Sequence, residues 1–519
     1  MAAGCGGDDA PATDGPVTDG PATDAPAGDA PDAPLDDVPR AESAACRYDV
    51  PGSLGLAEGV GYTCGDLVVY EDRQARGRTI RLHYIRFAST AASANATIYL
   101  DGGPGGDGQN IIAYAGFLGT SFLQGLLVDG DFLVISQRGT ARSIPFLECD
   151  DPSCGGSGYD LRAYNTAANA DDVDELRATL GFPQLNVYGI SYGSRLGLEV
   201  LRRHGDHVRA AVIEGLVPSS VPWPAAVPAS FYSALTALDA SCQAAGACGD
   251  AFGDLRSKFS AGVAALDANP MPILVQGTSF DLDGQTYAYL LFRMLYSKST
   301  FPWLPLVIND VAVRRADRID DFLAGVLGGG GSGPGISRGL YYSVVCGEIF
   351  SPPDPGAFEE ANAGLPADIV EIFGSSWPSL TQLCQTWPVT PGLQAELVVP
   401  VTSAVRTLVS SGRLDPITPP SFGTIAAATL ANAEVVIHEN SGHGATLQSP
   451  CATQNLHAFL ADPTATHDLS CAATIDTAYI LPAQSAPRPI PIARIHAELS
   501  MAPLPPEIAD HLHRKSLSR

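Results

Sequence analysis

A pentapeptide, Gly-Ile-Ser-Tyr-Gly at residues 189–193, sets the narrowest limits on how this chain can fold. It follows an apolar segment with strand character, 185–188, and precedes an amphipathic helical stretch, 195–204. A serine in such a strand–turn–helix element lies in a tight turn, where larger flanking side chains would clash with neighbouring backbone. Ser191 is therefore predicted to be a nucleophile projecting above a sheet. A loop serine without a role is the alternative.

The same pattern occurs a second time, at residues 335–339. Here Ser337 follows a glycine-rich run rather than a strand. Because the structural setting, and not the pattern alone, identifies a nucleophile turn, Ser191 is preferred to Ser337.

A serine hydroxyl needs a base to become a nucleophile, and the base needs a carboxylate to orient it. With the serine on a turn of this kind, the chain order is serine, then acid, then histidine. Asp415 follows the predicted strand 402–411, and His443 follows the next one, 434–438. Both are expected at the same sheet edge as Ser191, forming a catalytic triad. The alternatives are a turn aspartate before proline and a surface-loop histidine flanked by glycine.

A glycine-rich loop, Asp-Gly-Gly-Pro-Gly-Gly at 101–106, comes directly after the predicted strand 96–100. Glycines allow backbone N–H groups to approach a substrate oxygen, so the N–H of Gly103 and that of Tyr192 are predicted to form an oxyanion hole. No Gly-Lys-Ser/Thr ending follows, which excludes a phosphate loop. A plain glycine-rich turn is the alternative.

Strand-like and helical segments alternate through much of the chain, which predicts an α/β fold with a mainly parallel sheet covered by helices on both faces. The alternation is interrupted by a mostly helical insertion, expected to act as a lid. The predicted organisation is a disordered Pro/Asp-rich tether at 1–44, the two halves of the core at 45–220 and 398–481, the lid at 221–397, and a poorly ordered proline-rich tail at 482–519. The predicted strands are 67–70, 79–87, 96–100, 132–136, 185–190, 210–213, 402–411 and 434–438.

The formal charge of −26 argues against nucleic acid as a partner, because no basic stripe is present to release counterions from phosphates. No run of about 18 apolar residues occurs, so no membrane-spanning segment is expected. The sequence leaves the oligomeric state open.

The eleven cysteines are too many for an ordinary reduced cytosolic enzyme. They contain no Cys-x-x-Cys pair and have no histidine at zinc-ligand spacing, so no metal site is expected. Cys5 follows small residues, as at the end of a bacterial lipoprotein signal, and is a candidate for lipidation; a stray cysteine is the alternative. Proximity alone predicts disulfides between the others, and hence an oxidising compartment: Cys46–Cys64, Cys149–Cys154, Cys242–Cys248, Cys346–Cys384 and Cys451–Cys471.

Together these residues resemble the proline iminopeptidase and tripeptidyl aminopeptidase branch of the α/β-hydrolases, over about residues 46–475. Two positions depart from the family pattern: Asp101 stands where the iminopeptidase loop usually begins with histidine, and Ser136 where aspartate usually precedes the glutamine. The motifs that carry the resemblance are Gly-Gly-Pro-Gly at 102–105, Gln-Arg-Gly-Thr at 137–140, Gly-Ile-Ser-Tyr-Gly at 189–193, a helix over 164–177, and the segments 384–388, 414–416 and 441–444.

The resemblance implies an α/β-hydrolase that removes residues from free peptide N-termini. Hydrolysis through the predicted triad requires no cofactor. Such specificity requires a negative group for the substrate ammonium. Glu348 and Glu214 are the candidates, and the alternatives are solvated carboxylates or structural partners of Arg138. Two other functions remain open: an esterase or lipase that uses the same triad on small esters or lipids, and a non-catalytic surface-binding protein.

Overall fold

The structure, a computed structural model, describes residues 37–91, 94–149, 158–275, 278–327, 336–350, 356–389, 395–482, 490–500 and 504–517. It divides into two units, 1–37 and 38–519, and every element below belongs to the second. Most of the tether predicted over 1–44 lies outside the described residues, as do Cys5 and Cys154.

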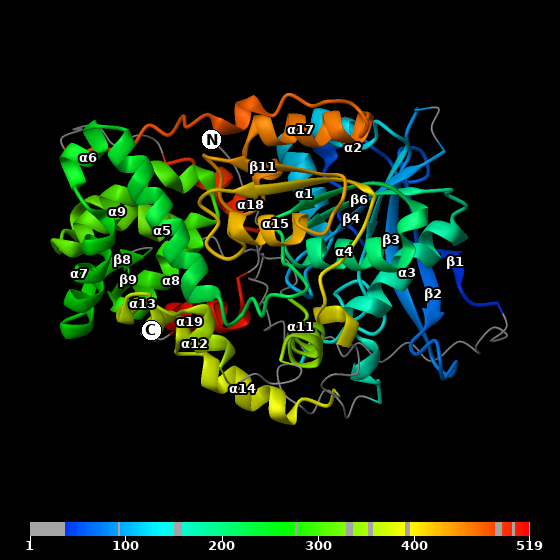
Figure 1. The fold of residues 1–519 in the computed structure, drawn as a ribbon, viewed down its shortest axis with the longest axis horizontal. Coiled ribbons are helices and arrows are strands. Elements are labelled where there is room, and N and C mark those ends of the chain that lie inside the picture. The colour runs from blue at the N-terminus through cyan, green and yellow to red at the C-terminus, as the bar shows by residue number, and fades with distance from the viewer. Residues whose placement is uncertain are drawn as a thin grey trace, which may run out of the picture. The chain divides into compact units, whose positions relative to one another are not determined.

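Nine strands form one sheet in the order β1-β2-β3-β5-β4-β6-β7-β10-β11 (Figure 1). The first three pairings are antiparallel, and those from β5 to β11 are parallel. This topology confirms the predicted α/β-hydrolase sheet. The strands are β1 (Arg40–Ser43), β2 (Tyr62–Tyr70), β3 (Thr79–Phe87), β4 (Ala96–Leu100), β5 (Asp131–Ile135), β6 (Leu185–Ile190), β7 (Val208–Glu214), β10 (Arg406–Gly412) and β11 (Ala433–His438).

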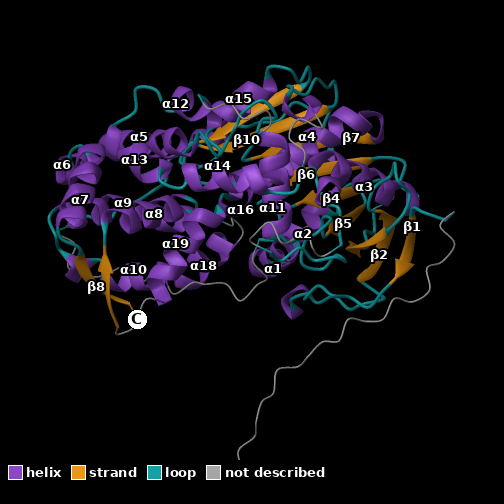
Figure 2. Ribbon diagram, turned by 90° about the horizontal axis from the view of Figure 1, so that it is seen from below, coloured by secondary structure: helices purple, strands orange, loops and turns teal. Residues whose placement is uncertain are grey.

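Helices cover both faces of the sheet, as Figure 2 shows from below. Neighbouring residues of β6 point to opposite faces, so Val187 belongs to one hydrophobic core and Tyr188 to the other. None of the helices in the described ranges is both long and apolar enough to cross a membrane. One face carries α1 (Gln109–Leu118), α2 (Thr120–Leu126) and α17 (Pro450–Ala461); the other carries α3 (Thr166–Thr179), α4 (Tyr192–His204) and α15 (Pro420–Ala427).

The segment between β7 and β10 forms a layer of helices beside the sheet, drawn green to yellow in Figure 1. It also contains a two-stranded hairpin, β8 (Met271–Val275) and β9 (Thr278–Leu282), which the sequence interpretation missed. The helices are α5 (Val227–Ala244), α6 (Ala247–Phe252), α7 (Leu255–Ala268), α8 (Gly284–Leu295), α9 (Leu304–Ala312), α10 (Asp320–Leu327), α11 (Arg338–Val344), α12 (Ala357–Ala361), α13 (Ala367–Gly374) and α14 (Trp377–Thr386).

The C-terminal segment differs from its prediction as a poorly ordered tail, because it contains α18 (Ile492–Ser500) and α19 (Pro506–Leu517). Both helices bury apolar residues four apart: Ile495 and Leu499 in α18, Ile508 and Leu512 in α19. They pack on α10 and α8 of the helical layer. The proline-rich composition had concealed these two short amphipathic helices. At the other end, β1 lies inside the segment predicted to be a disordered tether, since it pairs with β2.

Four of the five predicted disulfides are present: Cys46–Cys64, Cys242–Cys248, Cys346–Cys384 and Cys451–Cys471. Cys149 is also disulfide-bonded, but its predicted partner lies outside the described residues.

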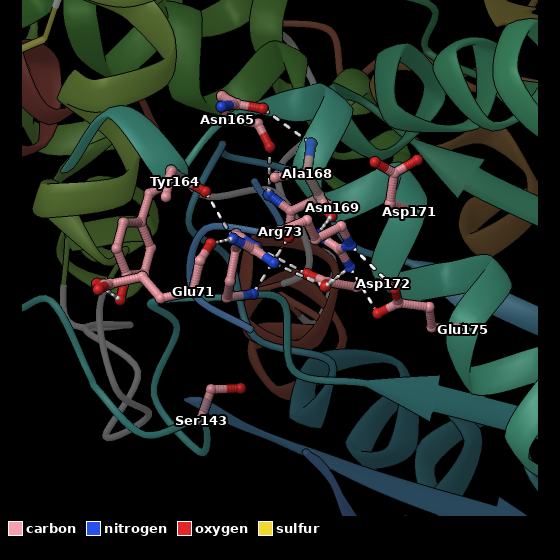
Figure 3. A network of polar contacts seen from close by, with 12 residues as sticks. Glu71, Arg73, Ser143, Tyr164, Asn165, Ala168, Asn169, Asp171, Asp172 and Glu175 are labelled. Carbon is pink, nitrogen blue, oxygen red and sulfur yellow. Dashed lines mark hydrogen bonds and ion pairs between the residues drawn. The ribbon is translucent and has the colours of Figure 1, made fainter. Parts of the chain in front are cut away.

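A buried ion-pair network fixes α3 against the loop that follows β5 (Figure 3). Asp172 accepts hydrogen bonds from Nε and Nη2 of Arg138, both at 2.7 Å, and from Nη2 of Arg73 at 2.5 Å. The remaining nitrogen of Arg138, Nη1, donates to the backbone carbonyls of Glu71 and Ala163. The side chain of Arg138 has no exposed surface, so its charge depends on these partners.

We expect Asp172→Asn to lower the free energy of unfolding by about 3–5 kcal/mol, because it leaves the buried Arg138 without its counter-charge. Urea unfolding would measure the change. As a control, Asp317→Asn removes an exposed partner of Arg315 and is expected to cost less than about 1 kcal/mol. An Asp172→Asn variant as stable as the control would contradict the structural role assigned to this pair.

Candidate active site

Ser191 occupies the turn between β6 and α4 and has backbone angles of φ 59° and ψ −127°. Such a positive φ is unfavourable for any residue other than glycine, so the surroundings must hold the turn in place. A Cβ on Gly189 would lie 2.2 Å from the carbonyl oxygen of Gly193, and one on Gly193 would lie 1.9 Å from that of Leu100. Both flanking glycines are therefore required sterically.

The loop after β4 passes directly over this serine. A Cβ on Gly102 would lie 2.8 Å from Cβ of Ser191 and 3.3 Å from its Oγ. The backbone N–H groups of Gly103, which follows this contact, and of Tyr192, the first residue of α4, come from the two segments beside the hydroxyl. The two residues predicted to form an oxyanion hole thus belong to the two segments that flank Ser191.

The buried Asp101 fixes the start of the glycine-rich loop at 101–106 through hydrogen bonds. Its Oδ1 accepts hydrogen bonds from the Gly102 N–H at 2.9 Å and the Tyr99 hydroxyl at 3.0 Å. Its carbonyl oxygen accepts another from Nε2 of Gln137 at 2.9 Å. Burial raises the pKa of the Asp101 carboxyl to about 7. The aspartate that departs from the family pattern thus supports the loop from inside the protein.

Asp415 and His443 meet in a buried hydrogen bond of 2.8 Å between Oδ2 and Nδ1. Oδ1 of Asp415 accepts hydrogen bonds from the N–H groups of Ile417 and Thr418, at 3.0 and 2.9 Å. The Thr418 hydroxyl donates to Oδ2 at 2.6 Å and lies 2.9 Å from Nδ1 of His443. These contacts fix the carboxylate and make Nδ1 the nitrogen that faces it. Thr418 is a contact that the sequence interpretation missed, although it follows Asp415 by three residues.

The turn at the end of β7, formed by Glu214 and Gly215, connects this pair with Ser191. The backbone N–H of Ser191 donates to the carbonyl oxygen of Glu214 at 2.9 Å. At the next residue, a Cβ on Gly215 would lie 3.1 Å from Cε1 of His443 and 3.2 Å from the Thr418 hydroxyl. Ser191 and His443 therefore each lie next to one of two consecutive residues, Glu214 and Gly215, at the carboxyl edge of the sheet.

The helical layer contacts the loop that carries His443. The Tyr296 ring lies against His443, with ring centroids 5.0 Å apart. Gln448, in the short helix α16 (Ala445–Gln448), donates from Nε2 to the Tyr296 carbonyl oxygen at 2.6 Å and also to that of His443. Its Oε1 accepts from the Lys298 N–H at 2.8 Å. Gln448 was not identified from the sequence, because its partners Tyr296 and Lys298 come from a segment about 150 residues away.

The two glutamates predicted to bind the substrate amine are instead bonded within the protein. Glu348 accepts hydrogen bonds from the Thr166 N–H at 2.7 Å and the Thr166 hydroxyl at 2.8 Å, and it pairs with Arg195 at 3.4 Å. Glu214 accepts from the Thr446 N–H at 2.8 Å and from the Thr446 hydroxyl. Burial raises the pKa of both carboxyl groups, that of Glu214 to about 7.

These contacts argue against the amine-binding role, since internal donors already engage both carboxylates. They also exclude the two alternatives given for these residues. Glu348 and Glu214 are 3% and 0% exposed, so they are not solvated, and the partner of Arg138 is Asp172.

Ser337, the serine of the second pentapeptide, is a helix cap. Its hydroxyl accepts a hydrogen bond from the Leu340 N–H at the start of α11 and donates to the Leu147 carbonyl oxygen at 2.9 Å. Its own N–H donates to the Gly105 carbonyl oxygen at 2.9 Å. Ser337 thus joins the helical layer to the glycine-rich loop.

Comparison with known proteins agrees with this architecture. Residues 98–240 match the model of the α/β hydrolase fold, and residues 370–471 match that of TAP-like proteins. A tripeptidyl aminopeptidase from Streptomyces coelicolor is 30% identical in an alignment of 193 positions that covers 30% of this chain and 35% of that protein. A proline iminopeptidase from Neisseria gonorrhoeae is 29% identical over 129 residues, which are 24% of this chain and 35% of that protein.

The chain thus aligns with only about a third of the length of these relatives. Among solved structures, a proline iminopeptidase from Mycobacterium smegmatis matches 76% of this chain and 96% of its own, at 14% identity and a TM-score of 0.34. The sheet topology and the sequence matches identify the chain as an α/β-hydrolase related to the tripeptidyl aminopeptidases and proline iminopeptidases.

Proposed function

We propose that this chain is an extracytoplasmic serine hydrolase that releases residues from the free amino termini of peptides through an acyl-enzyme. The observation that carries the proposal is the buried Asp415–His443 hydrogen bond, beside the turn that binds the backbone of Ser191. The aminopeptidase relatives support peptides as the substrate class.

In the proposed reaction, Ser191 attacks the substrate carbonyl while His443 takes the proton from its hydroxyl. Nδ1 of His443 faces Asp415, so Nε2 is the nitrogen that receives the proton. Asp415 holds the imidazole in this orientation and stabilises its positive charge. His443 then returns the proton to the leaving amine, and water cleaves the acyl-enzyme by the same route.

Negative charge develops on the carbonyl oxygen in both steps. The backbone N–H groups of Gly103 and Tyr192 are proposed to bind this oxyanion, and Tyr192 adds the positive end of the α4 dipole. Because these donors are backbone groups held in place by the fold, they need no reorganisation during the reaction.

The proposal includes an oxidising compartment outside the cytoplasm. The four disulfides formed by described residues support it, since such bonds rarely persist in a reducing cytosol. Cys5 is the proposed site of lipid attachment, and the Pro/Asp-rich residues 11–40 then link the anchor to the folded part.

Ser191→Ala is expected to abolish covalent labelling by a fluorophosphonate probe, because the probe reacts only with an activated serine. Circular dichroism would verify that the fold is retained. Ser337→Ala serves as the matched control, since this serine lies in the same pentapeptide pattern, and its labelling should persist. Undiminished labelling of Ser191→Ala would refute the assignment, and a wild-type chain that never reacts would favour a non-catalytic binding protein.

A second experiment separates the aminopeptidase from an esterase. An aminoacyl-4-nitroanilide with a free amine is expected to be cleaved at least tenfold faster than its N-acetylated form, because the proposed function requires recognition of the ammonium. Release of 4-nitroaniline measures both rates. Equal rates, together with rapid cleavage of short-chain esters, would favour the esterase.

Gly102→Ala is expected to slow fluorophosphonate labelling about 100-fold, because the new methyl group would displace the oxyanion loop from Ser191. Gly77→Ala is the control, since no atom lies within 4 Å of the added Cβ. If both variants were labelled at the wild-type rate, the close approach of Gly102 to Ser191 would not be a requirement for the reaction.

A further inference from the structure

A small cavity with aromatic walls lies in the helical layer, between the segment after β7 and helices α11, α13, α14 and α19. Its walls include the rings of Trp223, Tyr341, Phe373 and Trp377, and it is also lined by Glu507. Its volume of about 30 Å³ accommodates a group the size of one or two water molecules.

Glu507 contributes a carboxylate to this cavity from the first turn of α19. Its Oε1 is buried, and none of the described residues forms a hydrogen bond with that atom. The pKa of this carboxyl group is raised to about 7, chiefly by burial and also by the neighbouring Asp510, against the lowering effects of Arg338 and of the Tyr341 hydroxyl. The guanidinium of Arg338 forms an ion pair with Asp510. A buried carboxylate of this kind calls for a cation.

The cavity is connected to the candidate active site through α11. Ser337 binds the Gly105 carbonyl oxygen of the oxyanion loop and caps this helix. Tyr341 lies one turn further along, about 6 Å by helical rise. It also lies near Tyr296, whose ring packs against His443. Helix α11 and the Tyr296 ring thus link the walls of the cavity to the glycine-rich loop and to His443.

We propose that this cavity binds the protonated amino terminus of the peptide substrate, with Glu507 as counter-ion and the surrounding aromatic rings as walls. The inference rests on the aminopeptidase function proposed above and assigns its amine site to the C-terminal helix. It replaces Glu348 and Glu214 in that role, because those carboxylates are engaged by internal donors.

The chemistry of the cavity suits an ammonium group. Aromatic faces attract a cation through the ring quadrupole, most strongly where water is excluded. The carboxylate adds a charge-assisted hydrogen bond, which is stronger than a neutral one. An N-acetylated peptide has neither the charge nor the small size, so the cavity would distinguish the two substrates at their amino ends.

The test replaces Glu507 with glutamine, which keeps the shape of the side chain and removes its charge. Glu507→Gln is expected to raise KM for a tripeptidyl-4-nitroanilide with a free amine about 10- to 100-fold, with a smaller change in kcat. Cleavage of the N-acetylated form should be unaffected. Glu359→Gln, which removes an exposed carboxylate from α12 of the same layer, is the matched control and should behave as wild type.

Binding can also be followed without turnover. In a Ser191→Ala background, trialanine is expected to change the intrinsic fluorescence, since two of the four tryptophans line the cavity. Its affinity should exceed that of N-acetyl-trialanine at least tenfold, and adding Glu507→Gln should abolish the difference. The single variant Glu507→Gln, which retains Ser191, should still be labelled by the fluorophosphonate, and this labelling verifies that it is folded.

The outcomes separate this inference from the function on which it rests. A wild-type chain that prefers the free amine, with the preference intact in Glu507→Gln, would overturn the inference and leave the aminopeptidase standing. A wild-type chain with no preference for the free amine would overturn both.

Discussion

The contact between Gly193 and the carbonyl oxygen of Leu100 is the constraint on which the site depends. Because glycine has no Cβ, α4 can begin against the end of β4, and the turn before it holds Ser191 at a positive φ. The loop that leaves β4 must then pass over this serine, which is why Gly102 approaches it so closely. The turn that carries Ser191 and the glycine-rich loop at 101–106 are thus two parts of one packing arrangement.

Much of this arrangement could be predicted from the sequence, because it depends on local pattern and on chain order. The strands Thr79–Phe87, Ala96–Leu100 and Leu185–Ile190 lie where their apolar runs placed them. Asp415 and His443 follow successive parallel strands, β10 and β11, and parallel strands bring the loops at their carboxyl ends to one edge. The catalytic roles of these residues remain predictions for the labelling experiments to test.

The environment of buried charges could not be predicted in this way. Glu348 is bonded to Thr166, which lies 182 positions away in the sequence, and no local pattern records such a pairing. The same holds for Arg138 and Asp172, whose meeting depends on how α3 lies against the loop after β5. The C-terminal helices were missed because only their packing on α8 and α10 distinguishes them from a proline-rich tail.

The hydrogen bonds of Gln448 restrict how a substrate can reach the site. This side chain joins the carbonyl oxygen of His443 to the backbone at Tyr296 and Lys298, so the histidine loop and the base of the helical layer behave as one body. A movement of the whole helical layer away from the sheet would separate the His443 imidazole from Asp415. A substrate that binds as proposed must therefore reach Ser191 without separating residues 296–298 from the loop that carries His443.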